Sequence, residues 1–204
     1  MGQLDVPSIE SLRAPADRAA RAFQEALADI CVVRSAEGVI TEIGNDGRIV
    51  DVWGEVPLEQ LPDRSFGPAI EDAPGGSANQ SALTSFTLSC DVLVQEEREL
   101  VTLPNGLDLH YHSGLHTLIG DPVRFGAAYV SVAAEVDPWL DAPLHGGRFL
   151  DNRITAALNR PRLERALRRW ESAFGRTISE ISSVPYPALV DRYGFRPGGE
   201  PDPS

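Results

Sequence analysis

The chain has 204 residues and a formal net charge of -12, and all 18 of its basic side chains are arginine. The absence of lysine excludes a Walker-type phosphate loop and a Schiff-base enzyme, because both need an amine. Hydrophobic residues make up 42% of the chain, which is typical of a globular protein with its own core. No apolar run reaches the roughly 18–20 residues that span a membrane, and Met1–Asp5 has no signal-peptide character, so we expect a cytoplasmic protein.

The charge is unevenly distributed along the chain. Residues 1–147 hold 8 Arg and 23 acidic residues, whereas residues 148–204 hold 10 Arg and 7 acidic residues. The first part would repel nucleic acid, which is therefore not an expected partner. The sequence predicts an acidic α+β core over 1–147, an Arg-rich helical extension over 148–196 packed on that core, and a disordered tail over 197–204.

The chain is expected to begin with a helix over residues 15–30. Pro15 suits a first helical position, and Phe23, Leu27 and Ile30 recur at helical spacing. Strands are expected within residues 31–137. The first two, Val39 to Ile43 and Ile49 to Trp53, flank Gly44-Asn45-Asp46-Gly47, which is typical of a hairpin turn.

A short helix at 57–63 and a long Gly/Pro-rich loop at 64–81 are expected next. The remaining strands are predicted at 86–94, 100–103, 107–112 and 127–136. Pro104-Asn105-Gly106 fits a three-residue hairpin loop that pairs Leu103 with Leu107. In that register one face carries Val101, Leu103, Leu107, Leu109 and Tyr111, and the other carries Leu100, Thr102, Asp108, His110 and His112.

Helices are expected to dominate residues 148–196. A short helix is predicted from Asp151 to Leu158, and a second that starts at Pro161 and stops at Gly175. Its apolar stripe comprises Leu163, Ala166, Leu167, Trp170 and Phe174. Thr177 to Glu180 has capping-box spacing, and Pro187 to Tyr193 is expected to form a last short helix.

These elements indicate an α+β fold. We expect a mostly antiparallel sheet of five to six strands, covered by the N-terminal helix and the C-terminal helices. The expected core comprises Phe23, Leu27, Val39, Ile43, Trp53, Leu88, Val101, Leu109, Val130, Leu163, Leu167 and Trp170.

One histidine cluster carries the clearest candidate chemistry. His110 and His112 would point to the same face of a strand, and His116 follows closely; together they are the candidate metal ligands. His145 could also complete the set, with Asp108 as ligand or second shell. Residues 110–116 resemble the first histidine motif of cupins, although a cupin has Glu where His116 stands and a second motif that is missing here. The alternatives are a solvated or helix-covered sheet face and a pH-responsive or ligand-contacting role.

The other candidate groups have simpler explanations. Cys31 and Cys90 lie in apolar stretches and are expected to be buried free thiols in a reducing cytosol, with a disulfide or a catalytic thiol as the alternative. The acidic pairs Glu71-Asp72 and Glu96-Glu97 are expected in solvated loops. The arginines at 160–169 are expected to pair with the protein's own acids, or else to bind an acidic partner or phosphate.

The order of elements over residues 15–137 resembles a PAS sensor domain. Asp46-Gly47-Arg48-Ile49 and the predicted hairpin through Pro104-Asn105-Gly106 carry this resemblance. It implies a pocket between the sheet and its covering helices. The strand at 86–94 and the loop at 64–81 depart from the pattern, and no residue for haem, flavin or chromophore attachment can be carried over.

The sequence thus leaves three functions open. The first is a non-catalytic cytoplasmic protein-binding module, like an inhibitor, immunity protein or adaptor, that engages a partner through its acidic surface. The second is a PAS-like small-molecule sensor, and the third a metal-dependent enzyme using His110, His112 and His116. No cofactor and no membrane contact are expected.

Overall fold

A computed structural model describes residues 9–43, 49–56, 80–113, 115–116, 124–125, 129–180 and 186–198. The predicted turn at 44–47, the predicted helix at 57–63 and most of the predicted loop at 64–81 lie outside these residues. None of the helices in the described part of the chain combines the length and the apolarity needed to cross a membrane.

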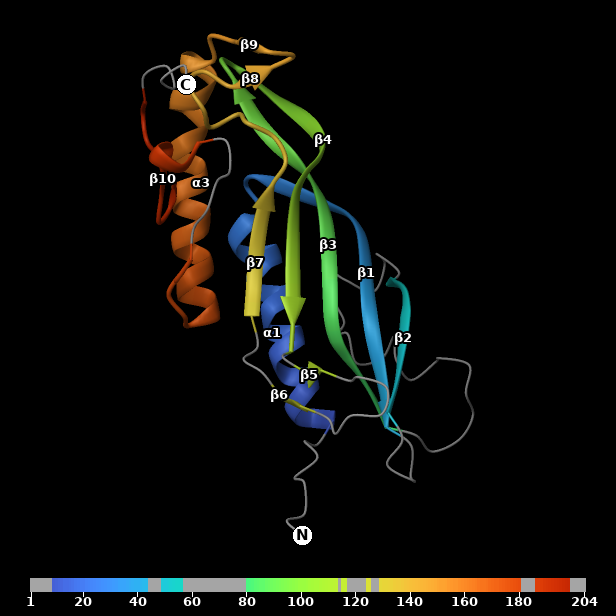
Figure 1. Ribbon diagram of the computed structural model, residues 1–204. Coiled ribbons are helices and arrows are strands. Elements are labelled where there is room, and N and C mark those ends of the chain that lie inside the picture. Colours follow the sequence, from blue (N-terminus) through green and yellow to red (C-terminus); the bar gives the residue numbers. More distant parts are fainter. Residues whose placement is uncertain are drawn as a thin grey trace. The chain divides into compact units, whose positions relative to one another are not determined.

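The main sheet has five strands in the order β2-β1-β3-β4-β7 (Figure 1). The α+β class with a mostly antiparallel sheet is thereby confirmed. In chain order, the strands of this sheet are β1 (Cys31–Ile43), β2 (Ile49–Val56), β3 (Gln80–Glu96), β4 (Glu99–His112) and β7 (Tyr129–Ala134).

The remaining elements are two long helices and several short pieces. The helices are α1 (Ile9–Leu27) and α3 (Arg153–Phe174). The short pieces are β5 (Leu115–His116), β6 (Arg124–Phe125), β8 (Leu144–His145), β9 (Arg148–Phe149), the 3-10 helix η2 (Pro187–Leu189), β10 (Val190–Asp191) and β11 (Gly194–Phe195).

The first predicted hairpin is confirmed. Strands β1 and β2 are antiparallel, with Val39 opposite Trp53 and Ile43 opposite Ile49. The strand-like residues and the four-residue turn signal were enough to predict this hairpin, because both depend only on residues close in sequence.

Helix α1 begins at Ile9, so the predicted start at Pro15 is wrong. Proline tolerates helical φ and removes a single backbone donor, and the helix continues through this position.

The second predicted hairpin is wrong, because β4 is one strand that runs through Pro104-Asn105-Gly106. The turn instead lies at Glu97-Arg98, between β3 and β4. Asn105 has a positive φ of 49°, which is typical of a β-bulge, and its N–H donates to Asp91 Oδ1 (3.1 Å). After the bulge, the strand has the predicted buried face: Leu107, Leu109 and Tyr111 are all buried, as expected from the alternation of apolar and polar residues.

The packing around this bulge leaves no room for a side chain at Gly106. A Cβ built on Gly106 would lie 2.7 Å from Val136 Cγ2 and 2.8 Å from Val92 Cγ2. We expect Gly106→Ala to lower the free energy of unfolding by about 1–3 kcal/mol through overpacking. Urea denaturation should show this loss. The additional change Val92→Ala should relieve it in part, and an unchanged midpoint for Gly106→Ala would contradict the tight packing.

Helix α3 is continuous through Pro161, so the predicted break between two helices is wrong. Its end at Gly175 is confirmed: Gly175 has φ 70° and donates its N–H to Glu171 O (2.9 Å). Residues 177–180 are irregular rather than the start of a helix, and the predicted helix at 187–193 is replaced by η2 and the small β10–β11 pair.

Six predicted core residues are buried: Phe23, Leu27, Leu88, Leu109, Leu163 and Trp170. Four others are partly exposed, namely Val39, Val101, Val130 and Leu167, and the side chains of Ile43 and Trp53 lie outside the described ones. Among the fully buried side chains, the largest that the sequence did not single out are Trp139 and Phe86.

The chain divides into two compact units. Unit 1 comprises residues 1–21, 33–89 and 108–133, and unit 2 comprises residues 22–32, 90–107 and 134–204. The organisation predicted from the sequence, with a 1–147 core and a 148–196 extension, stays a prediction.

Candidate functional site

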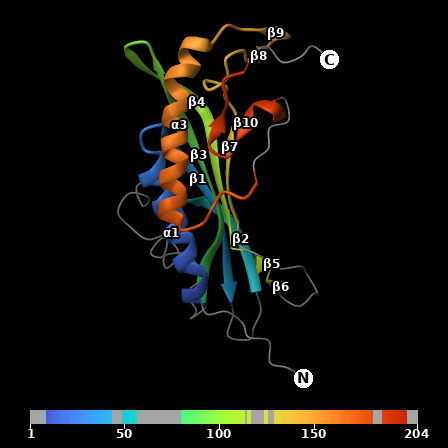
Figure 2. The same cartoon turned by 90° about the vertical axis from the view of Figure 1, so that its left-hand side faces the viewer.

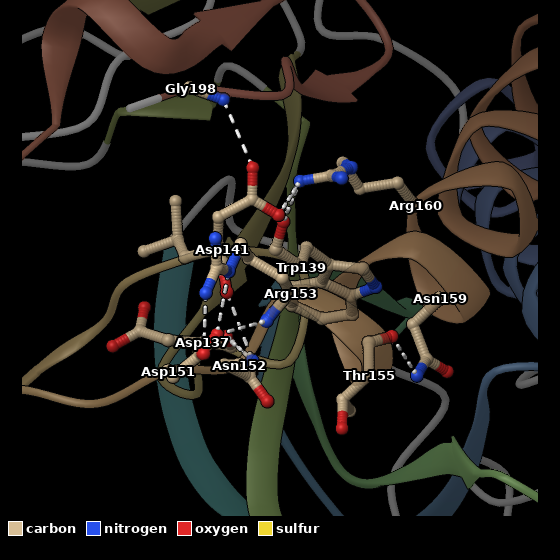
Figure 3. A network of polar contacts seen from close by, with 11 residues as sticks. Asp137, Trp139, Asp141, Asp151, Asn152, Arg153, Thr155, Asn159, Arg160 and Gly198 are labelled. Carbon is tan, nitrogen blue, oxygen red and sulfur yellow. Dashed lines mark hydrogen bonds and ion pairs between the residues drawn. The ribbon is translucent and has the colours of Figure 1, made fainter. Parts of the chain in front are cut away.

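The start of α3 is held in place by a network of polar contacts in unit 2 (Figure 3). Arg160 Nη1 lies 2.7 Å from Asp141 Oδ1, and both side chains are largely shielded from solvent. The second oxygen of Asp141 accepts the N–H of Gly198 (3.1 Å). Asn152, the residue before α3, donates its side-chain amide to the carbonyls of Leu140 (3.0 Å) and Asp137 (3.3 Å). The loop before α3 is thereby tied to the helix by several independent bonds.

Two aromatic residues anchor the same loop. Trp139 is 1% exposed and stacks on Phe195, with ring centroids 6.3 Å apart. The buried Tyr186 accepts the N–H of Leu144, the first residue of β8, through its hydroxyl at 2.7 Å. The β8–β9 hairpin therefore rests on a packed and hydrogen-bonded base.

Next to this base the protein exposes a set of large apolar side chains, which we term the α3 patch. Leu144 and Phe149 are cross-strand partners, so they share one face of the β8–β9 hairpin. Ile154 and Leu158 are four residues apart and share one face of α3. Exposure ranges from 37% to 69% across the patch, which comprises Leu144, Phe149, Leu150, Ile154 and Leu158.

A buried amide joins α3 to the end of β3. Asn159 is 2% exposed, and its Oδ1 accepts the backbone N–H of Gln95 (2.8 Å) while its Nδ2 donates to Gln95 O (2.9 Å). Nδ2 also donates to Thr155 O (2.8 Å), and Arg162 Nη1 donates to Oδ1 (2.8 Å). This residue acts as a polar clamp between α3 and the end of β3.

The clamp brings an acidic turn next to α3. Glu96, Glu97 and Glu99 are all exposed and follow Gln95 closely in the chain. The side chain of Gln95 donates to the carbonyls of Glu97 (3.2 Å) and Glu99 (3.1 Å), which closes the turn. The expectation that Glu96 and Glu97 are solvated is confirmed by their exposure. We term these three glutamates the acidic turn.

Three of the arginines at 160–169 pair with the protein's own acids, as expected: Arg160, Arg168 and Arg169. Arg169 lies 2.7 Å from Asp29 Oδ2, and Arg168 lies 2.9 Å from Glu164 Oε1. Arg162 donates to the carbonyls of Leu93 (2.8 Å) and Asp29, and desolvation by burial lowers the pKa of its guanidinium. Arg162 and Arg169 thus tie α3 to the end of β3 and to the turn that follows α1.

A hollow of about 360 Å³ lies at the other end of α3, lined by Arg168, Glu171, Arg176 and Tyr193 among others. Glu171 accepts the N–H of Ile178 (2.6 Å) and the hydroxyl of Tyr193 (2.8 Å), and these bonds hold the pKa of its carboxyl below its ordinary value. Arg168 covers the Tyr193 ring at 3.9 Å. Glu171 also lies 3.3 Å from Arg192, so the carboxylate that lines the hollow has its partners within the protein and holds the end of α3 together.

The histidine candidates lie in different surroundings. His110 Nδ1 is 3.0 Å from Thr87 Oγ1 of β3, and the His112 ring stacks on Tyr129 of β7 at 5.4 Å. His116 is opposite Arg124 in the β5–β6 pair, and its side chain is not among the described ones. His145 belongs to unit 2, whereas the other three belong to unit 1. Over the described residues, no three His, Cys, Asp or Glu side chains gather as metal ligands; the set including His116 stays a prediction.

The two cysteines are buried free thiols, as the sequence predicted. The sequence did not identify Asn159, Asp141 or the α3 patch. The sequence does contain a signal for the patch. When residues 153–174 are treated as one helix, Ile154 and Leu158 lie on a different face from the apolar stripe that contains Leu163 and Trp170.

Comparison of the chain with known protein families, with curated proteins and with solved structures found no match.

Proposed function

We propose that this chain is a non-catalytic cytoplasmic protein-binding module, of the inhibitor, immunity or adaptor kind, that engages a partner through an acidic surface. In this proposal that surface is carried by a mostly antiparallel sheet of five to six strands, covered by the N-terminal helix and the C-terminal helices. The observation that carries it is the α3 patch. Large apolar side chains exposed on two segments that follow each other in the chain, the β8–β9 hairpin and the first turns of α3, are typical of protein interaction sites.

The charge of the chain supports the same proposal. A net charge of -12 favours encounter with a basic partner and makes association sensitive to salt. For the two alternative functions, a small-molecule sensor and a metal-dependent enzyme, the described residues offer no supporting observation of this kind.

The test is site-specific photo-cross-linking in an extract of the source cells. A benzophenone side chain at Ile154 (69% exposed) should capture one protein of defined mass, whereas the same group at Val32 (43% exposed) should not. Raising the salt from about 0.05 M to about 0.5 M should weaken the capture, because the charges are then screened. The reciprocal experiment with the purified candidate should reproduce the adduct. A bare monomer after irradiation at Ile154 would contradict the proposal.

A further inference from the structure

We propose that the hollow at the end of α3 binds a phosphate group through arginine and hydroxyl side chains. The side chains that would hold it are those of Arg168, Ser172, Arg176 and Thr177, all of which line the hollow. This proposal goes beyond the proposed function, because it concerns a small anion rather than a protein partner and uses no residue of the α3 patch.

The end of α3 brings these side chains together. Arg168 and Ser172 are four residues apart and therefore share one face of the helix. At Gly175 the backbone takes the left-handed conformation, and the chain turns away from the lower end of α3 (Figure 2). Arg176 and Thr177 follow this turn directly and line the same hollow. Its volume of about 360 Å³ lies within the range of small-molecule sites, about 300–1,000 Å³.

The guanidinium of Arg168 is already positioned for an anion. It covers the Tyr193 ring at 3.9 Å, while its Nε and Nη2 atoms lie 3.0 and 2.9 Å from Glu164 Oε1. Within the described part of the chain, no acceptor lies within hydrogen-bond distance of its Nη1 atom. A guanidinium that is held in this way loses little freedom when its remaining donors bind a phosphate oxygen.

Arg176 supplies a positive charge that no acid neutralises among the residues that the structure describes. It is exposed, and the ion pairs at this end of α3 join Arg168 to Glu164 and Arg192 to Glu171 instead. The carboxylate of Glu171 also accepts two hydrogen bonds from within the protein. An arginine without an acidic partner is notable in a chain that has 30 acidic residues against 18 arginines.

The negative charges near the hollow are weaker than the positive charges that face it. Glu171 is paired with Arg192, and the carbonyl end of a helix carries only about half an elementary charge. The side chain of Glu164 is 50% exposed, so water screens its attraction for Arg168. The full charges of Arg168 and Arg176 therefore favour an anion here.

Phosphate is the anion that suits these donors best. A guanidinium binds phosphate through two parallel N–H···O bonds, and the hydroxyl groups of Ser172 and Thr177 are additional donors. The oxygens of a tetrahedral phosphate point in different directions, so they can accept bonds from α3 and from the residues after Gly175 at once. A carboxylate has two oxygens in one plane. Free phosphate and a small phosphate monoester share this chemistry.

The test is a nuclear magnetic resonance titration of the full ¹⁵N-labelled chain with inorganic phosphate, with the ionic strength held at about 0.15 M by sodium chloride. The amide signals of Gly175 and Thr177 should shift saturably, whereas that of Ile154 should not. Acetate should bind at least about tenfold more weakly than phosphate. Glycerol 3-phosphate distinguishes the sources: binding at least about tenfold tighter than inorganic phosphate identifies a monoester, and equal binding identifies the free ion.

A matched pair of variants locates the site. Arg176→Gln should weaken phosphate binding by about tenfold or more, and its urea midpoint should stay that of the parent, because the exposed side chain has no ion pair within the described residues to lose. Arg165→Gln removes the same charge from an exposed position of the same helix outside the hollow, and it should change the affinity by less than about twofold.

Three results would overturn the proposal. The first is the absence of a saturable shift at Gly175 and Thr177, and the second is equal weakening by Arg176→Gln and Arg165→Gln. The third is equal binding of acetate and phosphate. Photo-cross-linking at Ile154 is independent of these measurements, so the proposed function and the phosphate site can fail separately.

Discussion

Trp139→Ala is expected to lower the free energy of unfolding by about 3–5 kcal/mol, a large part of the stability of an ordinary domain. Trp139 is 1% exposed and stacks on Phe195 in parallel, at an interplanar angle of 3°. Removing the indole leaves a cavity under the loop that leads to β8, and neighbouring backbone already tied to Arg160 and Asn152 has little freedom to fill it.

Urea denaturation followed by far-ultraviolet circular dichroism measures this loss without depending on tryptophan fluorescence. Leu144→Ala, at a side chain 49% exposed, is the control and should change the free energy of unfolding by about 0.5 kcal/mol or less. Trp139→Phe should recover a large part of the stability because it refills the stacked position. A loss below about 1 kcal/mol for Trp139→Ala would show that the loop is not anchored by this residue.

Asn159→Ala is expected to lower the free energy of unfolding by about 2–4 kcal/mol. The substitution removes four hydrogen bonds and leaves the N–H and carbonyl of Gln95 without this partner in a partly buried place. The cost of unpaired buried groups exceeds the net worth of the bonds themselves.

Amide hydrogen exchange distinguishes a local effect from a general one. The Gln95 amide should exchange faster in Asn159→Ala at a temperature where the protein remains folded. Asn159→Asp retains an acceptor for Gln95 N–H and Arg162 but loses both donated bonds, so its stability should lie between the parent and the alanine variant. Glu164→Ala, at an exposed position of the same helix, should leave Gln95 protected; equal exchange in both variants would contradict a clamp at Asn159.

The parts of the fold that the sequence predicted correctly depend on short-range signals. The pairing of β1 with β2 was predicted from two strand-like segments that flank a turn signal, and the end of α3 was predicted from a glycine, which has the left-handed conformation. Pro104-Asn105-Gly106 shows where such signals are ambiguous, because the same residues suit a hairpin loop and a β-bulge. The contact that selects the bulge joins Asn105 to Asp91, which are far apart in the sequence.

The candidate site was hidden by a similar ambiguity. Splitting α3 at Pro161 separated Ile154 and Leu158 from the stripe that contains Leu163 and Trp170, so their position away from that stripe could not be seen. Asn159 was missed because a polar residue inside a helix is usually solvated, and only its bonds to Gln95 reveal its role. The acidic turn was noticed in the sequence, but its proximity to α3 depends on that same long-range contact.

The division into two compact units has a consequence for how the protein can be dissected. The boundaries of the units fall after residues 21, 32, 89, 107 and 133, so the chain passes from one unit to the other five times. Helix α1 and strands β1, β3, β4 and β7 each contribute residues to both units. No single stretch of chain corresponds to either unit, and neither can be obtained as a contiguous fragment. We therefore expect the units to lose their structure together in one cooperative transition.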